Sequence, residues 1–153
     1  LYRRSLYTYW KRQSPPPGML IFDAPTREYC VVRRPRTNTP LQALALLNDL
    51  QMVDASKAFA QRMLVHGGKE TNARITYGFR LATARKPDAE ELKVLRAVLD
   101  HQLAEYRANK GEAEKLIEAG SYRPDKDLDP AELAAWTTLA NLLLNLDETI
   151  TKN

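Results

Sequence analysis

The sequence is poor in the residues that bind metals or form disulfides. Cys30 is the only cysteine among 153 residues, so no disulfide can form within the chain. His66 and His101 are the only histidines, and no cluster of Cys, His and acidic residues has metal-ligand spacing. Glycine-rich phosphate loops, nucleophile elbows, HExxH and the haem-attachment sequence CxxCH are missing as well. We therefore expect no metal or cofactor in this chain, and we assign no catalytic residue.

Long apolar runs and leader sequences are also missing. No apolar run approaches the roughly 20 residues that a membrane helix needs, so we expect no membrane span. The first residues, Leu1-Tyr2-Arg3-Arg4, contain neither an initiator Met nor a following apolar segment of the kind found in signal peptides. We expect the chain to be a piece of a longer polypeptide, and its own residues do not indicate a compartment.

What the chain does contain is an uneven distribution of charge. Residues 1–36 hold eight Lys and Arg against Asp23 and Glu28, which gives a net charge of +6. The whole chain carries +4, so the remaining residues sum to −2. A basic N-terminal quarter on a mildly acidic body favours an acidic partner, which is another domain, a protein or a polyanion.

Two sequence segments are strong helix starts. Thr39 can cap a helix that begins at Pro40, with Gln42 completing a Thr-x-x-Gln capping box. In that helix three leucines fall on one face: Leu41, Leu44 and Leu47. The second start is Asp129-Pro130-Ala131-Glu132, and the helix after it is apolar nearly all round. A helix of that kind is normally buried among others, so we expect it to be the central element of the core.

The rest of the chain also has helical periodicity and clear stops. Weaker signals predict further helices over residues 2–13, from Asn48-Asp49 to His66, from Thr71 to before Pro87, from Asp88 until Gly111, and over 112–119. Tyr29-Cys30-Val31-Val32 is read as a short strand or an extended strap. The predicted fold is all-α: a single domain that is an irregular orthogonal bundle of about six helices. In it, residues 1–36 form a basic strap with the first helix, and residues 37–153 form the helical core.

The polar residues around the first helix start are the candidate site. Asn141 and Asn145 lie four apart on the apolar helix, and a buried amide must be hydrogen-bonded, so the backbone of residues 38–40 is a candidate partner. Asp147 and Glu148 follow that helix and are candidates for ion pairs with the strap arginines. We therefore predict a structural clasp or interaction site made of Arg33, Arg34, Arg36, Asn38, Thr39, Asn48, Asp49, Asn141, Asn145, Asp147 and Glu148.

Several segments resemble a known family. The segment Arg33 to Asp49 resembles the hallmark segment of the planctomycete-specific PSD family of unknown function. The segments Ser5 to Arg12 with Pro15-Pro16-Pro17, Phe79 to Pro87 and Leu142 to Glu148 also agree with it, so the resemblance covers essentially the whole chain. It implies the C-terminal domain of a large exported protein, often behind a c-type cytochrome domain and a second uncharacterised domain. Any haem would then lie upstream, the setting would be extracytoplasmic, and no catalytic residue is carried over. Thr149-Ile150 departs from the family, which commonly has an aromatic residue there.

Three functions follow as alternatives. The first is a non-catalytic interaction or scaffolding module that docks onto an upstream domain or a protein partner. The second is an active site shared with an upstream domain, acting on polysaccharide, to which Arg34, Arg36, Asn38 or Asp49 would contribute. The third is binding of a polyanion such as an acidic polysaccharide through the basic strap. Nucleic acid is the weaker choice of polyanion, because the whole-chain charge is modest and the tyrosines and Trp10 of this region lie at helical spacing.

Overall fold

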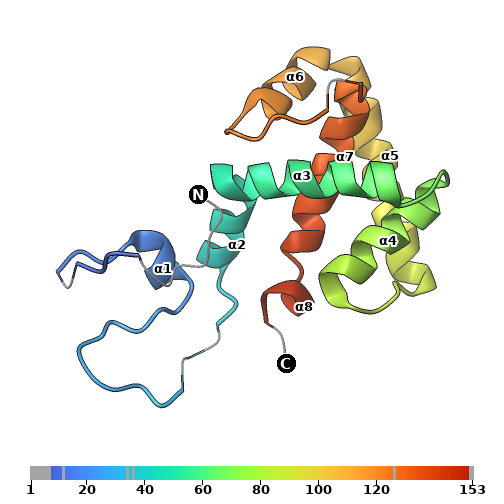
Figure 1. Ribbon diagram of the computed structural model, residues 1–153. Helices are drawn as coiled ribbons and strands as arrows, with labels where there is room; N and C mark the ends of the chain where they lie inside the picture. Colours follow the sequence, from blue (N-terminus) through green and yellow to red (C-terminus); the bar gives the residue numbers. More distant parts are fainter. Residues whose placement is uncertain (1–7, 12, 34, 36, 126, 152–153) are drawn as a thin grey trace. The chain divides into compact units, whose positions relative to one another are not determined.

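The computed structural model describes residues 8–11, 13–33, 35, 37–125 and 127–151 (Figure 1). These residues form eight helices and no strand, so the predicted all-α class is confirmed. Two short helices were not foreseen: α1 (Pro17–Ile21) and α8 (Asp147–Ile150). None of the helices in the described part of the chain is long and apolar enough to cross a membrane.

The chain divides into two compact units, Leu1–Ala45 and Leu46–Asn153. The division falls inside α2 (Pro40–Asn48), nine residues after the predicted end of the strap at position 36. Each unit is therefore described by itself. The expectation of a single domain over 1–153 stays a prediction.

The first unit contains one correction to the predicted elements. Residues 8–11 are not helical, and the remainder of the helix predicted over 2–13 lies largely outside the described residues. Instead, the guanidinium of Arg27 stacks over the Trp10 ring. The distance from the Arg27 Cζ to the ring centroid is 5.0 Å. Three consecutive prolines, Pro15 to Pro17, come next in the chain. The last of them is the first residue of α1 (Pro17–Ile21). Tyr29 to Val32 form an exposed loop and not a strand.

The second unit is a bundle built around α7 (Pro130–Leu144). Its other helices are α3 (Leu50–His66), α4 (Thr71–Thr83), α5 (Ala89–Ala108), α6 (Lys110–Glu118) and α8 (Asp147–Ile150). Helix α7 packs against all five, most extensively against α3, which runs across it (Figure 1). Nine of the fifteen residues of α7 are buried, so the prediction that this helix is the central element is confirmed.

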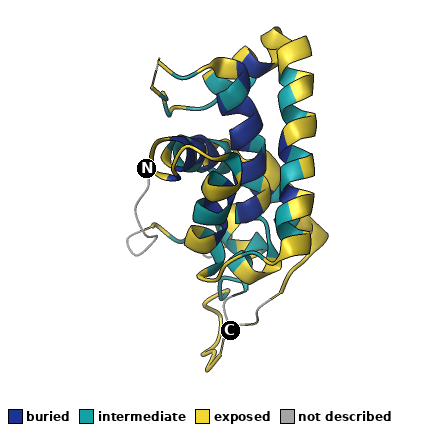
Figure 2. Ribbon diagram, turned by 90° about the vertical axis from the view of Figure 1, so that its right-hand side faces the viewer, coloured by how far each residue is buried: buried dark blue, intermediate teal, exposed yellow. Residues whose placement is uncertain are grey.

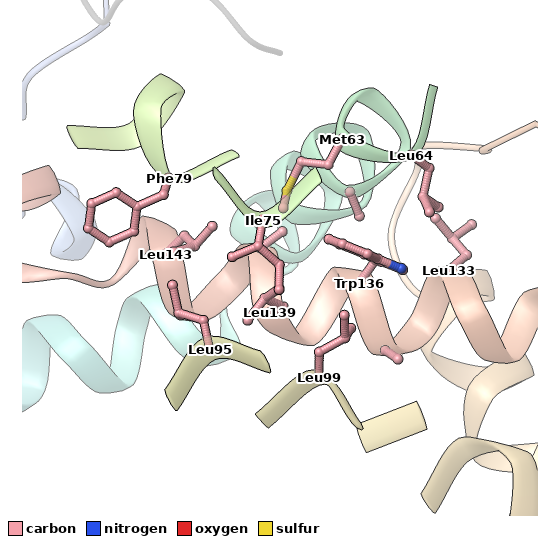
Figure 3. Packing of buried hydrophobic residues seen from close by; sticks show 13 residues of the cluster. Met63, Leu64, Ile75, Phe79, Leu95, Leu99, Leu133, Trp136, Leu139 and Leu143 are labelled. Atoms are coloured by element: carbon pink, nitrogen blue, oxygen red, sulfur yellow. The ribbon is translucent and has the colours of Figure 1, made fainter. Parts of the chain in front are cut away.

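The core is formed where α3, α4 and α5 meet α7. Figure 2 shows the buried positions gathered in the interior of the bundle, with the exposed positions facing outward. Figure 3 shows the labelled side chains of this cluster: Met63, Leu64, Ile75, Phe79, Leu95, Leu99, Leu133, Trp136, Leu139 and Leu143. Gly78 permits the approach of α4 to α3, because a Cβ at this position would collide with the Met63 side chain. The core cluster thus lies wholly within the second unit.

Cap chemistry sets the helix boundaries of this unit. The Asp88 carboxylate accepts from the backbone N–H of Glu91 at 2.7 Å, and the Glu91 carboxylate accepts from that of Asp88 at 2.8 Å. This is the predicted capping box at the start of α5. Asp129 caps α7 through the N–H of Glu132 at 2.7 Å, also as predicted. The break after α5 lies at Asn109, however, and Gly111, the predicted break, lies inside α6.

Candidate functional site

The predicted helix start at Thr39 organises a polar cluster in the first unit. Gln42 donates its backbone N–H to the Thr39 hydroxyl at 3.2 Å, and the Thr39 N–H donates to the Gln42 side-chain oxygen at 3.0 Å. The Gln42 amide nitrogen also donates to the Ile21 carbonyl at 2.8 Å and to the Thr37 hydroxyl at 2.9 Å. Asp23 in turn accepts from both the N–H and the hydroxyl of Thr37. Because Gln42 is buried, these bonds hold the loop over α2.

The apolar stripe on α2 faces solvent. Leu41 and Leu44 are 57% and 58% exposed, whereas Gln42 is buried. Tyr29 and Val32, in the loop before α2, are exposed as well. Arg33 is also exposed, and Arg34 and Arg36 lie outside the described residues. The first unit therefore presents large apolar side chains and a basic residue at its surface.

The C-terminal part of α7 lines a cavity of about 520 Å³ in the second unit. Its apolar walls come from five residues, four of them on the helices α2, α3, α6 and α7 and the last between α7 and α8: Leu47, Val53, Leu116, Leu142 and Leu146. Leu47 and Leu142 are 47% and 36% exposed, so they lie where the cavity opens to solvent. None of the described residues that line it is charged. A volume of this size and an apolar wall are typical of small-molecule sites.

Both predicted asparagines lie in this cavity, and they differ in their hydrogen bonds. Asn141 donates its amide to the Leu47 carbonyl at 3.3 Å, which ties α7 to the last turn of α2. The contact predicted with the backbone of residues 38–40 would join the two units, and it stays a prediction. The Oδ1 atom of Asn145 is buried and accepts no hydrogen bond from the described residues. Nearly all buried polar atoms in proteins are satisfied, so this oxygen marks a position where a donor is expected.

A hydroxyl pair completes the polar part of the cavity. Thr138 donates to the Ala134 carbonyl at 3.2 Å, and its oxygen lies 3.2 Å from the hydroxyl of Tyr106. A threonine hydroxyl has one hydrogen, so Tyr106 is the donor in this pair. The Tyr106 oxygen then keeps acceptor capacity, as does the Asn145 carbonyl oxygen.

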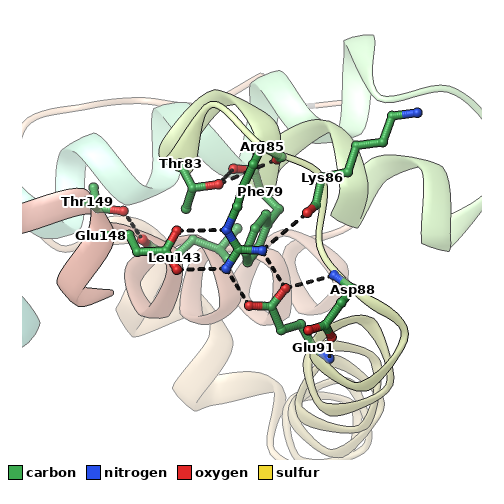
Figure 4. A network of polar contacts seen from close by, with 9 residues as sticks. All are labelled: Phe79, Thr83, Arg85, Lys86, Asp88, Glu91, Leu143, Glu148 and Thr149. Atoms are coloured by element: carbon green, nitrogen blue, oxygen red, sulfur yellow. Dashed lines mark hydrogen bonds and ion pairs between the residues drawn. The ribbon is translucent and has the colours of Figure 1, made fainter. Parts of the chain in front are cut away.

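The acidic pair after α7 has a different arrangement. Glu148 accepts two bonds from Arg85, one from Nε at 2.9 Å and one from Nη2 at 2.7 Å (Figure 4). The same guanidinium binds both oxygens of Glu91, and it lies 4.8 Å from the Phe79 ring centroid. Asp147 accepts from the Thr151 hydroxyl at 2.9 Å. Arg85 therefore joins the end of α4 to the capping box of α5 and to α8.

Arg85 holds the carboxylates in their charged form. Its hydrogen bonds, with the backbone bond from Asp88, lower the pKa of Glu91 to about 2. Hydrogen bonding to Arg85 also lowers the pKa of Glu148, and the two carboxylates together raise the pKa of Arg85. Two bidentate pairs on one guanidinium make a geometrically specific link between three elements.

A buried ion pair in α3 was missed by sequence reasoning. Lys57 is fully buried, and its Nζ lies 2.9 Å from Asp54. The ammonium also donates to the carbonyls of Ile117, Ala119 and Tyr122, while Asp54 accepts from the Ser121 N–H at 2.8 Å. Gly120 makes this arrangement fit, because its φ is +72° and a Cβ there would collide with Asp54. These contacts anchor the loop after α6 to α3.

The other predicted site residues have local roles. Asp49 caps α3 by accepting from the Gln51 N–H at 2.7 Å. Asn38 lies exposed before α2, and Asn48 is the exposed last residue of that helix. No group of three or more His, Cys, Asp or Glu side chains within the described ranges is arranged to hold a metal ion. The clasp between the strap and the end of α7 stays a prediction.

The fold and the cavity together define an all-α protein with a mainly apolar pocket that also contains polar side chains. A family model described as "Protein of unknown function (DUF1553)" and named PSD1 matches residues 1–99. The chain therefore belongs to this family. No curated protein and no solved structure matches the chain.

Proposed function

We propose that this protein is a non-catalytic helical interaction or scaffolding domain that docks through its first unit onto an acidic protein surface. This acidic surface belongs to the upstream part of the same polypeptide. The observation that carries the proposal is the exposure of large apolar side chains on a strongly basic unit. Monomeric proteins rarely expose such groups together without a partner.

The apolar part of the docking surface is formed by Val32 and Leu41. Val32 is fully exposed and Leu41 is 57% exposed. The bonds of Gln42 to the Ile21 carbonyl and the Thr37 hydroxyl hold the start of α2, so Leu41 is displayed by an ordered segment. A preorganised surface loses less entropy on binding than a disordered one.

The charge of this segment specifies the partner's chemistry. Residues 1–36 carry a net charge of +6, and Arg33 is exposed. Exposed apolar side chains in a basic segment fit an acidic surface with an apolar groove, since complementary charge speeds encounter and fixes orientation. The remainder of the chain carries −2, so it offers less attraction to such a surface.

The setting of this interaction follows from the family resemblance. We propose that the domain is the C-terminal part of an exported planctomycete protein with a c-type cytochrome domain upstream. Any haem would be held there, and the location would be extracytoplasmic. This part of the proposal is tested by the full-length gene product and its haem content.

Binding of the chain to the separately expressed upstream region tests the docking. We expect Val32→Asp and Leu41→Asp each to raise the Kd for the upstream region about tenfold or more. Each variant removes an apolar side chain from the interface and replaces it with a negative charge that the acidic partner repels. Both side chains are exposed, so the fold should be unaffected. Val94→Asp is the matched control, because Val94 is 59% exposed on α5 in the other unit.

Two results would overturn this proposal. One is an absence of binding at low salt; the other is equal Kd values for the two variants and the control. Affinity for acidic polysaccharide that falls steeply with salt, with no affinity for the upstream region, would identify a polyanion-binding domain instead.

A further inference from the structure

We propose that the cavity of the second unit binds an uncharged, mainly apolar small molecule that carries one hydrogen-bond donor. This site belongs to the second unit, since every described residue of its lining lies in Leu46–Asn153. The juxtaposition that carries the inference is a cavity of about 520 Å³ with apolar walls and an unpaired amide oxygen.

The apolar walls of the cavity determine which kind of ligand body it favours. Val53 of α3, Leu116 of α6 and Leu142 of α7 face the cavity from three sides, and Leu47 and Leu146 continue the apolar lining. Apolar area removed from water stabilises such a complex by about 25 cal/mol per Å². An alkyl chain or an aromatic ring is therefore the favoured filling.

The charge of the lining decides what is excluded. Among the described residues no Lys, Arg, Asp or Glu belongs to the lining, so an ionised head group would lose its hydration without gaining an ion pair from them. A carboxylate has no hydrogen to donate, so it would also leave the buried oxygen of Asn145 without a donor. Fatty acids and ammonium compounds are thus disfavoured relative to neutral molecules of the same size.

The polar groups decide the head of the ligand. Asn145 Oδ1 is buried without a donor from the described residues. Tyr106 uses its hydrogen for Thr138, and Asn141 uses one of its two amide hydrogens for the Leu47 carbonyl. The buried Asn145 oxygen therefore requires a donor, which a hydroxyl or an amide N–H on the ligand supplies.

Calorimetric titration of the full chain with matched probes tests this inference. We expect n-decanol to bind more tightly than its methyl ether, which lacks the hydroxyl hydrogen, by about tenfold, as expected for one buried hydrogen bond. Decanoate should bind more weakly than the alcohol. In Asn145→Leu the preference for alcohol over ether should fall to near one, a readout that a merely structural role of Asn145 would not change.

Filling the cavity supplies a second, independent test. Val53→Trp should abolish binding of n-decanol, because Val53 lines the cavity. Val94→Trp makes the same change at an exposed position outside the lining, and it should bind as the wild type does. The inference is overturned if n-decanol does not bind the wild type up to its solubility limit, or if Val53→Trp binds it equally well. An unchanged alcohol-to-ether ratio in Asn145→Leu would overturn the assignment of the donor site.

Discussion

At the scale of single residues, the most consequential side chain is Lys57. It is fully buried, it pairs with Asp54 at 2.9 Å, and it donates to three carbonyls around the loop after α6. A buried ion pair contributes less than its geometry suggests, because both ions lose their hydration. Removing only one partner is different, since the other charge is then left buried and uncompensated.

Lys57→Met should therefore lower the free energy of unfolding by about 3 kcal/mol. The physical cause is the uncompensated carboxylate of Asp54 together with carbonyls that lose their donor. Urea denaturation measures this loss. Asp54→Leu combined with Lys57→Met should lose less than the single variant, because no buried charge remains.

Lys115→Met is the matched control for this experiment. Lys115 also pairs with a carboxylate on its own helix, Glu112, at 2.8 Å, but both side chains are largely exposed. Its removal should leave the denaturation midpoint nearly unchanged. Equal losses for Lys57→Met and Lys115→Met would show that the buried pair does not stabilise the loop.

At the scale of elements, Arg85 connects α4, α5 and α8 by binding Glu91 and Glu148. Folding lowers the pKa of Glu91 from 4.5 to about 2, and it lowers the pKa of Glu148 as well. A carboxylate with a depressed folded-state pKa stabilises the fold above its unfolded-state pKa. That stabilisation is lost as the pH falls through the folded-state pKa.

The pH dependence of stability should therefore distinguish wild type from Arg85→Leu. We expect the difference in their thermal midpoints to be largest above the unfolded-state pKa of 4.5 and to shrink as the pH falls toward about 2. Thermal denaturation followed by circular dichroism across this range measures it. Arg96→Leu removes an exposed i,i+4 pair with Asp100 and serves as the control. A difference for Arg85→Leu that is constant with pH would contradict the role assigned to the two carboxylates.

The sequence predicts these elements where their determinants are local. The capping residues Thr39, Asp88 and Asp129 each act within three positions, so the starts of α2, α5 and α7 could be identified directly. Gly111, in contrast, was predicted to end a helix but lies in the first turn of α6, where a glycine destabilises a helix little. The helix predicted over 2–13 is wrong at residues 8–11, where amphipathic spacing had no cap to support it and three prolines follow.

The candidate site was less predictable because its contacts are distant in sequence. Lys57 meets carbonyls 60 to 65 positions away, and Arg85 meets Glu148 at a separation of 63. No periodicity encodes such pairs. Asn145 was identified as a polar residue on an apolar helix, but its unpaired oxygen emerges only from the packing around it.

At the scale of the whole molecule, the division into Leu1–Ala45 and Leu46–Asn153 predicts that the second unit folds alone. Every residue of its hydrophobic cluster lies between Phe59 and Leu146, so truncation before Leu46 removes no core side chain. The fragment Leu46–Asn153 should therefore unfold cooperatively on heating, as single domains do. It also keeps all the described residues that line the cavity, so its Kd for n-decanol should equal that of the full chain, whereas its affinity for the upstream region should be lost. Circular dichroism and calorimetry measure these quantities on the fragment and the full chain side by side. A gradual melt without a transition would instead show that residues 1–45 are needed for folding. The chain would then behave as the single domain that the sequence predicts.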